Sequence, residues 1–221
     1  VKTAENAYRD VNIAFANEVA LICEAVGGDV WRVRELVNKS PGRNMLYPGA
    51  GVGGHCIPKD PWLLSHQARA QGTSVRLIPA SRAVNESMPL HMVDLLEDAL
   101  AEVDIDLAEA RVIVLGYAYL ENSDDVRNSP SAVLVSALHE RGTEVMIHDP
   151  YVLGYQGDFY AMAEGCDAVV IMVKHDAYGE IDWETLRRRL VQPVVVDGRR
   201  VVGSTPADFV VRAIGEVADV P

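Results

Sequence analysis

The sequence is poor in cysteine, in basic residues and in long apolar runs, and each shortage argues against a class of protein. Its 221 residues contain three cysteines without C-x-x-C spacing, so neither a disulfide framework nor a zinc knuckle is expected. The sequence has 20 Lys and Arg residues but 32 Asp and Glu residues. The resulting formal charge of -12 argues against nucleic acid or an anionic membrane as partner. No apolar run approaches the roughly 20 residues that span a bilayer. We therefore expect a globular, cytoplasmic protein.

The first hundred residues have the pattern of helices interrupted by one long loop. Apolar residues recur at spacings of three and four over residues 11–26, which predicts a long amphipathic helix closed by Gly27 and Gly28. The Gly- and Pro-rich segment 40–60 predicts a loop. Further helices are expected over residues 29–39, 61–72 and 79–103, and Pro89 predicts a kink or a restart in the last of these.

After Ala110 strands and helices alternate. Continuous apolar strands are expected in RVIVLG, EVMIHDP, DAVVIMV and PVVVDG, and a last helix in PADFVVRAIGEV, residues 206–217. Strand–helix–strand units of this kind predict a parallel sheet covered on both faces. We place a boundary near residues 104–110, which divides the chain into an all-helical domain (1–103), ending in a long connecting helix, and an α/β domain (104–221). Only Gly116 follows the first strand, so a dinucleotide is not expected to bind there through G-x-G-x-x-G.

The segment GGHCIPKDP, residues 53–61, contains a candidate nucleophile. Cys56 follows a glycine pair whose free backbone N–H groups could stabilise an oxyanion, and Asp60 lies four residues further on. The alternative is a buried cysteine in a structural turn, which spacing alone favours because cysteine is among the most buried residue types.

Other polar residues have two interpretations each. Lys2 and Asn6 share one face of the first predicted helix, which suits an oxyanion hole or a sugar-hydroxyl clamp, or else a solvated face near a frayed terminus. The loops contain further residues that could bind an anionic ligand: Arg43, Tyr47, Arg127 and Arg199. The alternative is that they are simply exposed or belong to loops that cap helices. The six histidines are scattered and form no metal-ligand pattern, so no metal is expected.

Several motifs occur together in an order that resembles the UDP-glucose/UDP-N-acetylmannosamine dehydrogenases. They are KTAENAYRDVNIAFANEVALIC, GVGGHCIPKDPW, RAVNESMP, VLGYAYLENSDDVRNSP, IHDPYV and VVDGRR. The resemblance runs along essentially all 221 residues, and GGHCIP followed by Trp62 is closer to the UDP-N-acetylhexosamine branch. It implies a helical dimerisation domain joined by a long helix to a Rossmann-like parallel α/β domain that binds UDP. The NAD-binding domain of such enzymes would be absent, so we expect a fragment of a homodimeric enzyme that is inactive alone.

The resemblance also implies a reaction and roles. The family oxidises the C6 alcohol of a UDP-sugar to a carboxylate in two hydride transfers to NAD, and Cys56 would form a thiohemiacetal and then a thioester. Lys2, Asn6 and Asp60 match the residues that stabilise the oxyanion and orient water. The implied substrate contacts are Gly53, Arg199 and Arg43, which would reach the substrate of the neighbouring subunit, and the implied cofactor contact is Arg127. Tyr47, in the same loop as Arg43, is expected as a further substrate-binding residue.

One residue departs from the family pattern. Leu120 stands where many relatives have a lysine that contacts the substrate, so either another cation replaces it or the sugar nucleotide binds more weakly or in another pose. UDP-N-acetyl-D-mannosamine is the expected substrate, with UDP-glucose or UDP-N-acetylglucosamine as alternatives. A catalytically silent UDP-sugar-binding or assembly module also stays open. An unrelated cysteine hydrolase is a weaker alternative, because no histidine can be tied to Cys56 from the sequence.

Overall fold

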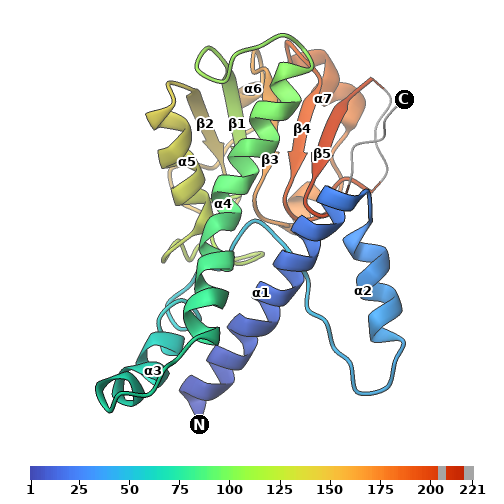
Figure 1. Cartoon of the computed structure of the whole chain (residues 1–221). Helices are drawn as coiled ribbons and strands as arrows, with labels where there is room; N and C mark the ends of the chain where they lie inside the picture. Colours follow the sequence, from blue (N-terminus) through green and yellow to red (C-terminus); the bar gives the residue numbers. More distant parts are fainter. Residues whose placement is uncertain (204–207, 217–221) are drawn as a thin grey trace.

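The structure, a computed structural model, describes residues 1–203 and 208–216. A parallel sheet occupies the upper part of the molecule in Figure 1, and a long helix runs along it and down to the helices below. The helices of the first half are α1 (Lys2–Val26), α2 (Val30–Asn38), α3 (Asp60–Ala70) and α4 (Leu77–Ala101). Within the described residues no helix has both the length and the apolar character needed to cross a membrane.

The predicted ends of the first two helices are confirmed. Gly27 closes α1 with a φ of 78°, the left-handed conformation that glycine adopts without a steric penalty. Asp29 caps α2, because its carboxylate accepts hydrogen bonds from the N–H groups of Trp31 and Arg32, at 2.7 and 3.1 Å. The apolar face of α1 divides in two. Ala14, Ala20 and similar small residues are buried, whereas larger side chains face solvent.

Helix α4 runs through Pro89 without a restart, so that part of the prediction is wrong. Pro89 is buried, and its ring lies against the loop before Cys56, where a Cβ on Gly51 would be 3.0 Å from Pro89 Cγ. Tertiary packing holds this proline inside a helix that its missing N–H would otherwise weaken.

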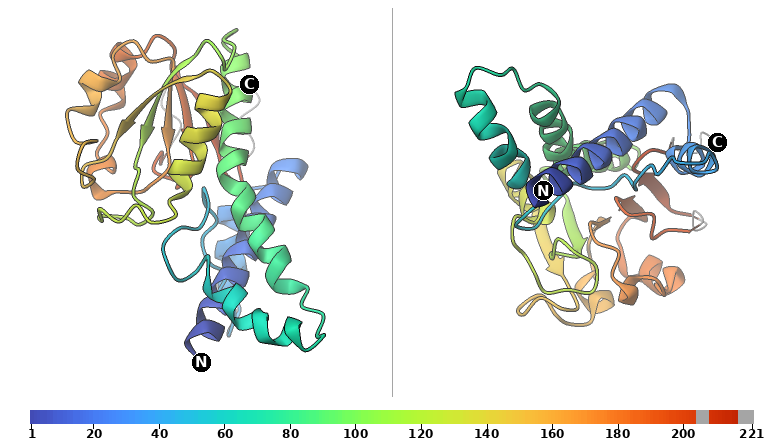
Figure 2. Two further views of the ribbon diagram at one scale, coloured as in Figure 1. Left: turned by 90° about the vertical axis from the view of Figure 1, so that its left-hand side faces the viewer. Right: turned by 90° about the horizontal axis from the view of Figure 1, so that it is seen from below.

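The second half of the chain forms one five-stranded sheet in the order β2-β1-β3-β4-β5, with every pair parallel. Its strands are β1 (Arg111–Leu115), β2 (Glu144–His148), β3 (Ala168–Ile171), β4 (Val194–Asp197) and β5 (Val210–Ala213). The helices α4 and α5 (Pro130–Glu140) cover one face, and α6 (Phe159–Met162) and α7 (Trp183–Arg189) cover the other (Figure 2). A short 3-10 turn, η1 (Asp176–Tyr178), follows β3. The sheet is therefore covered on both faces, as the continuous apolar strands predict.

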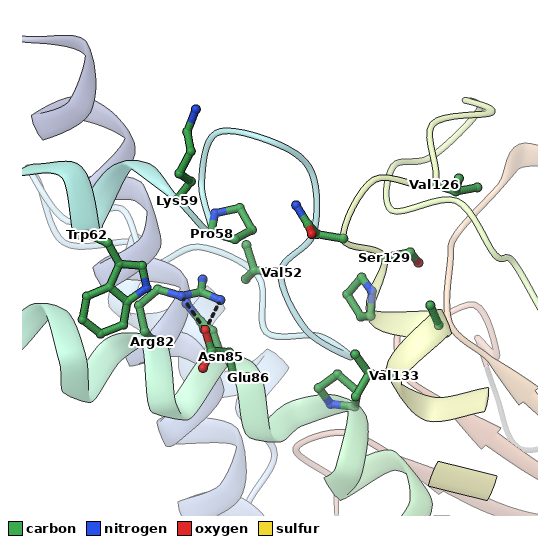
Figure 3. Close-up of a pocket in the computed structure, with 14 residues that line it drawn as sticks. Val52, Pro58, Lys59, Trp62, Arg82, Asn85, Glu86, Val126, Ser129 and Val133 are labelled. Atoms are coloured by element: carbon green, nitrogen blue, oxygen red, sulfur yellow. Dashed lines mark hydrogen bonds and ion pairs between the residues drawn. The ribbon is translucent and has the colours of Figure 1, made fainter. Parts of the chain in front are cut away.

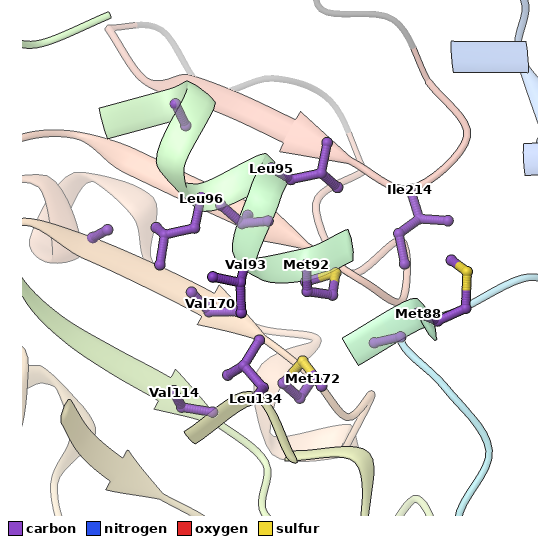
Figure 4. Close-up of a cluster of buried hydrophobic side chains, with 14 of the residues drawn as sticks. Met88, Met92, Val93, Leu95, Leu96, Val114, Leu134, Val170, Met172 and Ile214 are labelled. Atoms are coloured by element: carbon purple, nitrogen blue, oxygen red, sulfur yellow. The ribbon is translucent and has the colours of Figure 1, made fainter. Parts of the chain in front are cut away.

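The two faces of the sheet bury separate cores. Val112 and Val114 point into the core shared with α1, α4 and α5, and the alternate residues Ile113 and Leu115 point toward α6 and α7. Met92 of α4 belongs to the first core together with Val170 and Met172 (Figure 4). The period-two alternation of strands produces this division.

The helix expected over residues 206–217 is wrong in the part that the structure describes. Val210–Ala213 forms β5 and pairs with β4, in register from Val194 opposite Val210 to Asp197 opposite Ala213. The β-branched pair at 210–211 beside an open sheet edge favours a strand, and short apolar runs do not separate the two choices by spacing. Residues 204–207 and 217 lie outside the described part.

The segment 104–110 connects α4 to β1, where the boundary was expected. The core does not divide there, because α4 packs along α1 at one end and on the sheet at the other. The division into 1–103 and 104–221 therefore stays a prediction.

Candidate active site

The loop that carries Cys56 is docked on the loop that follows β1. The Gly54 N–H donates to the Arg127 carbonyl at 2.8 Å, and the Asn128 side-chain amide donates to the Gly54 carbonyl at 3.0 Å. Both backbone groups of Gly54 are thus used in holding the two loops together. The expectation of a free N–H for an oxyanion is wrong at this position.

The glycine pair also allows a close approach to Tyr119. A Cβ on Gly53 would lie 2.5 Å from Tyr119 Cβ, and one on Gly54 would lie 2.8 Å from Tyr119 Cε2. Gly54 in addition has a φ of 88°. Residues with side chains do not fit at either position without a shift of the loop.

Cys56 is exposed, so the interpretation as a buried structural cysteine is wrong. Cys23 and Cys166 are buried, and desolvation raises the pKa of the Cys166 thiol to about 11. Cys56 is therefore the one thiol of the three that a solute can reach.

Helix α3 and helix α1 bring two polar side chains to the Cys56 loop. The Asp60 N–H, at the start of α3, donates to the Cys56 carbonyl at 2.8 Å. The Asn6 amide donates to Asp60 Oδ2 at 2.6 Å, and both side chains are buried. Lys2 lies one turn before Asn6, is exposed and pairs with Glu5 at 3.2 Å. Lys2 and Asn6 line one hollow of about 340 Å³.

Arg127 is held beside the Cys56 loop by a carboxylate of its own segment. Its Nε donates to both oxygens of Asp125, at 2.9 and 3.0 Å. Hydrogen bonds from Arg127 lower the pKa of Asp125 to about 2. The Arg127 side chain is exposed.

A second hollow, of about 360 Å³, opens at the carboxyl ends of β3 and β4, and we call it the cationic hollow. It is lined by Trp31, Tyr47, Pro48, Glu121, Lys174, Arg199 and Arg200. Arg199 is anchored by its Nε, which donates to the Met172 carbonyl at 2.9 Å. Three cations against one carboxylate suit an anionic ligand.

Lys174 was missed by sequence reasoning. It follows β3 just as Arg199 follows β4, so the rule that ligands bind at the carboxyl ends of parallel strands could have found it. Its ammonium makes no hydrogen bond or ion pair among the described residues. By contrast, Arg43 donates to the Pro41 carbonyl of its own turn and lines none of the hollows named here.

A larger cleft of about 720 Å³ lies behind the Cys56 loop, between α3, α4 and α5 (Figure 3). Its walls are mainly apolar and include Trp62, Pro58 and Val133. Arg82 lies at one end, where it is buried and donates to Glu86. The cleft therefore lies between the back of the loop and the helices α4 and α5.

Two observations concern possible metal and nucleotide sites among the described residues. No three His, Cys, Asp or Glu side chains among them are grouped to hold a metal ion. The turn after β1 is closed, because a Cβ on Gly116 would lie 2.4 Å from Val173 Cβ. Tyr119 of the same loop packs on Gly53 and Gly54.

Two models of the UDP-glucose/GDP-mannose dehydrogenase family match the chain. The central domain matches residues 1–87, and the UDP binding domain matches residues 113–204. Together they cover both halves of the fold described above.

Named relatives match along nearly the whole chain. A UDP-N-acetyl-D-mannosamine dehydrogenase of Pyrococcus horikoshii is 40% identical over 215 residues, which are 97% of this chain and 51% of that protein. The solved structure of a UDP-D-ManNAc dehydrogenase from the same organism has a TM-score of 0.92 at 39% identity, and covers 96% of this chain and 50% of its own. A UDP-glucose dehydrogenase structure from Pyrobaculum islandicum has a TM-score of 0.85 at 33% identity, with 98% of this chain and 50% of its own covered. The chain spans about half the length of the curated relatives it matches.

Proposed function

The chain belongs to the UDP-glucose/GDP-mannose dehydrogenase family, and we propose that it is the part of an NAD-dependent UDP-sugar 6-dehydrogenase that carries the nucleophile and binds UDP. The observation that carries the proposal is the exposed Cys56 thiol beside two polar residues. The Cys56 carbonyl accepts a hydrogen bond from the Asp60 N–H, and the Asp60 carboxylate accepts one from the Asn6 amide. A binding module has no need of such a nucleophile. UDP-N-acetyl-D-mannosamine is the proposed substrate, because relatives at 38–40% identity carry that name.

The proposed role of Cys56 begins at the aldehyde level of C6. Its thiolate adds to the aldehyde carbon, a C–S bond forms, and the carbonyl electron pair moves to the oxygen as an oxyanion. The Lys2 ammonium and the Asn6 amide are the donors proposed to stabilise that oxygen. The spacing of four residues on α1, with both side chains lining one hollow, supports this pairing.

The second proposed step of this chain is hydrolysis of the thioester that oxidation leaves on Cys56. Water adds to the acyl carbon, the C–S bond breaks, and the thiolate and the sugar carboxylic acid separate. Asp60 is proposed to hold this water, because Asn6 occupies its Oδ2 and leaves Oδ1 as an acceptor. The pairing with Asn6 also fixes the direction of the carboxylate.

The cationic hollow is proposed as the site of the UDP diphosphate. Arg199 and Lys174 would neutralise the phosphate charge, and Tyr47 with Gly53 would border the sugar nucleotide. Lys174 is the proposed replacement for the lysine that many relatives have in place of Leu120. Its ammonium lines the same hollow as Arg199 and has no partner among the described residues.

NAD is the proposed hydride acceptor, and we propose that its site lies mainly outside the described residues. Arg127 is the one contact proposed from this chain, because its exposed side chain lies beside the Cys56 loop. The remaining contacts would come from outside these 221 residues.

A homodimer is proposed through α1. Tyr8, Phe15 and Ile22 are spaced by seven residues, and each is more than half exposed, at 72%, 56% and 53%. Such a stripe on a regular helix is typical of a helix–helix interface. Arg43 would reach the neighbouring subunit's substrate from the loop after α2. The proposed location is the cytoplasm, where reduced cysteines persist.

The test of the function is NAD reduction by the full gene product with UDP-N-acetyl-D-mannosamine, UDP-glucose and UDP-N-acetylglucosamine. Cys56→Ser should abolish turnover, and Cys166→Ser, which changes a buried thiol, serves as the matched control. Equal activity of Cys56→Ser and the unaltered protein would remove the nucleophile role. UDP binding without any turnover would instead favour a silent binding module.

A further inference from the structure

Loops after two strands of the sheet meet at one buried carboxylate. Asp149 directly follows β2, and its side chain has no exposed surface. Its Oδ2 accepts from the N–H groups of Tyr117 and Ala118 after β1, at 2.7 and 2.9 Å. Its Oδ1 accepts from Tyr151 and Val152 of its own loop, at 2.9 and 3.1 Å. Burial alone would raise the pKa of Asp149, but these hydrogen bonds outweigh it and lower the pKa below its usual range.

A histidine ties the loop after β3 to the same carboxylate. His175 is fully buried, and its Nε2 lies 3.1 Å from Asp149 Oδ2. On the other side of the ring, Nδ1 accepts from the Asn122 N–H at 2.9 Å. Because a backbone amide can only donate, Nδ1 carries no hydrogen, and Nε2–H is the donor to Asp149. The Asn122 side-chain oxygen also accepts a hydrogen bond from the N–H of Asp176, the residue after His175, at 3.0 Å.

The backbone positions that hydrogen-bond to Asp149 and His175 lie next to residues of the Cys56 loop contact and of the cationic hollow. Between Ala118 and Asn122 lie Tyr119, which packs against the glycine pair of the Cys56 loop, and Glu121, which lines the cationic hollow. Lys174, which lines the same hollow, directly precedes His175. One carboxylate and one imidazole therefore fix the backbone on both sides of Tyr119 and Glu121, and on the C-terminal side of Lys174.

We propose that His175 and Asp149 are positioning residues that hold Lys174 and Glu121 in the cationic hollow and Tyr119 against the Cys56 loop. Neither side chain lines the hollow, so both act through the residues that they tie. The inference rests on the proposed function, in which this hollow takes the diphosphate of a UDP-sugar.

The chemistry of the position explains why a histidine stands there. The site needs a donor toward Asp149 and an acceptor toward the Asn122 amide, on opposite edges of one compact side chain. A neutral imidazole supplies both, whereas phenylalanine would leave the buried carboxylate short of one donor and the amide without an acceptor. His148 gives a matched comparison. It is also buried, but its ring bonds to the Gly157 carbonyl and the Tyr178 hydroxyl, away from the loop after β1.

The experiment compares His175→Phe with His148→Phe in the whole chain, by calorimetric titration with UDP. We expect His175→Phe to bind UDP about tenfold to a hundredfold more weakly, the range for misplacing one charge-assisted contact. His148→Phe should stay within about twofold of the unaltered chain, because no residue of the hollow depends on its ring. The rate at which Cys56 reacts with a disulfide reagent should change in His175→Phe only.

A second measurement covers the case in which His175→Phe fails to fold. Hydrogen exchange of the Asn122 amide should be slow in the unaltered chain and about tenfold faster or more in Asp149→Asn, which keeps the shape but disturbs the tie. Fast exchange of Asn122 in the unaltered chain would overturn the inference. So would a folded His175→Phe chain that binds UDP as tightly as the unaltered one. No heat with UDP for the unaltered chain at millimolar concentration would overturn the proposed function itself.

Discussion

Replacing Gly53 by alanine is expected to push the Cys56 loop away from the sheet. The new Cβ would lie 2.5 Å from Tyr119 Cβ, 2.8 Å from the Asn128 carbonyl oxygen and 2.9 Å from Pro130 Cδ. All three atoms belong to the backbone or stay close to it, so none can swing aside. Overpacking of this kind lowers the free energy of unfolding by about 1–3 kcal/mol. For a chain of this size the melting temperature should fall by roughly 2–12 °C.

The assay is thermal unfolding, with Gly203→Ala as the control. A Cβ on Gly203 would meet no heavy atom within 4 Å, so its melting temperature should stay close to that of the unaltered chain. The rate of Cys56 labelling should change with Gly53→Ala and not with the control. Equal melting temperatures and equal labelling rates for the two variants would refute the close approach.

A double-mutant cycle separates two kinds of contact at the glycine pair. A Cβ on Gly54 would meet Tyr119 Cε2 and Cζ, at 2.8 and 2.9 Å, and Tyr119→Ala removes both atoms. The cost of Gly54→Ala should therefore fall in the Tyr119→Ala background, down to the strain of its positive φ. Gly53→Ala meets Tyr119 Cβ, which alanine keeps, and should not be rescued. Equal rescue of both would contradict the geometry.

Three further predictions concern the interface, the Arg127 pair and the cationic hollow. Phe15→Glu should shift sedimentation toward the monomer, because it places a charge in the exposed stripe of α1, and an unchanged dimer would place the interface elsewhere. Arg127→Gln should raise the pKa of Asp125 from about 2 toward 3.8 in an NMR titration. The pair therefore stabilises the fold above about pH 4 and loses this contribution as the pH falls toward 2. Lys174→Gln should weaken UDP binding about tenfold, and Lys39→Gln, which removes an exposed cation paired with Glu35, should not.

The fold could be predicted from the sequence wherever the local pattern and the packing agree. Gly27 and Asp29 end α1 and start α2 by rules that concern neighbouring residues only. The prediction was wrong at residues 210–213, where the pairing partner is β4 and the apolar run suits a helix or a strand. It was also wrong about a restart at Pro89, because the packing around that proline comes from residues distant in sequence.

The candidate site could be predicted only in part, for the same reason. Cys56 and Asp60 are near neighbours, and their juxtaposition follows from the start of α3. The contact of Asn6 with Asp60 joins residues 54 positions apart, and motif resemblance rather than spacing pointed to it. Lys174 belongs to none of the sequence motifs described above, and His175 is one of six scattered histidines that form no pattern in the sequence. The proposed roles of both residues can be recognised only when the fold brings the carboxyl ends of the strands to one edge of the sheet.

The position of Cys56 depends on parts of the chain that carry no candidate nucleophile. Its loop follows α1 and α2 in sequence. The Gly54 carbonyl nevertheless accepts a hydrogen bond from the side chain of Asn128, 74 residues away. The loop of Asn128 is in turn tied at Asn122 to His175. A chain cut after residue 103 would keep the thiol and lose every one of these contacts. The helical half therefore supplies the exposed thiol, and the loops that follow the strands hold its loop in place.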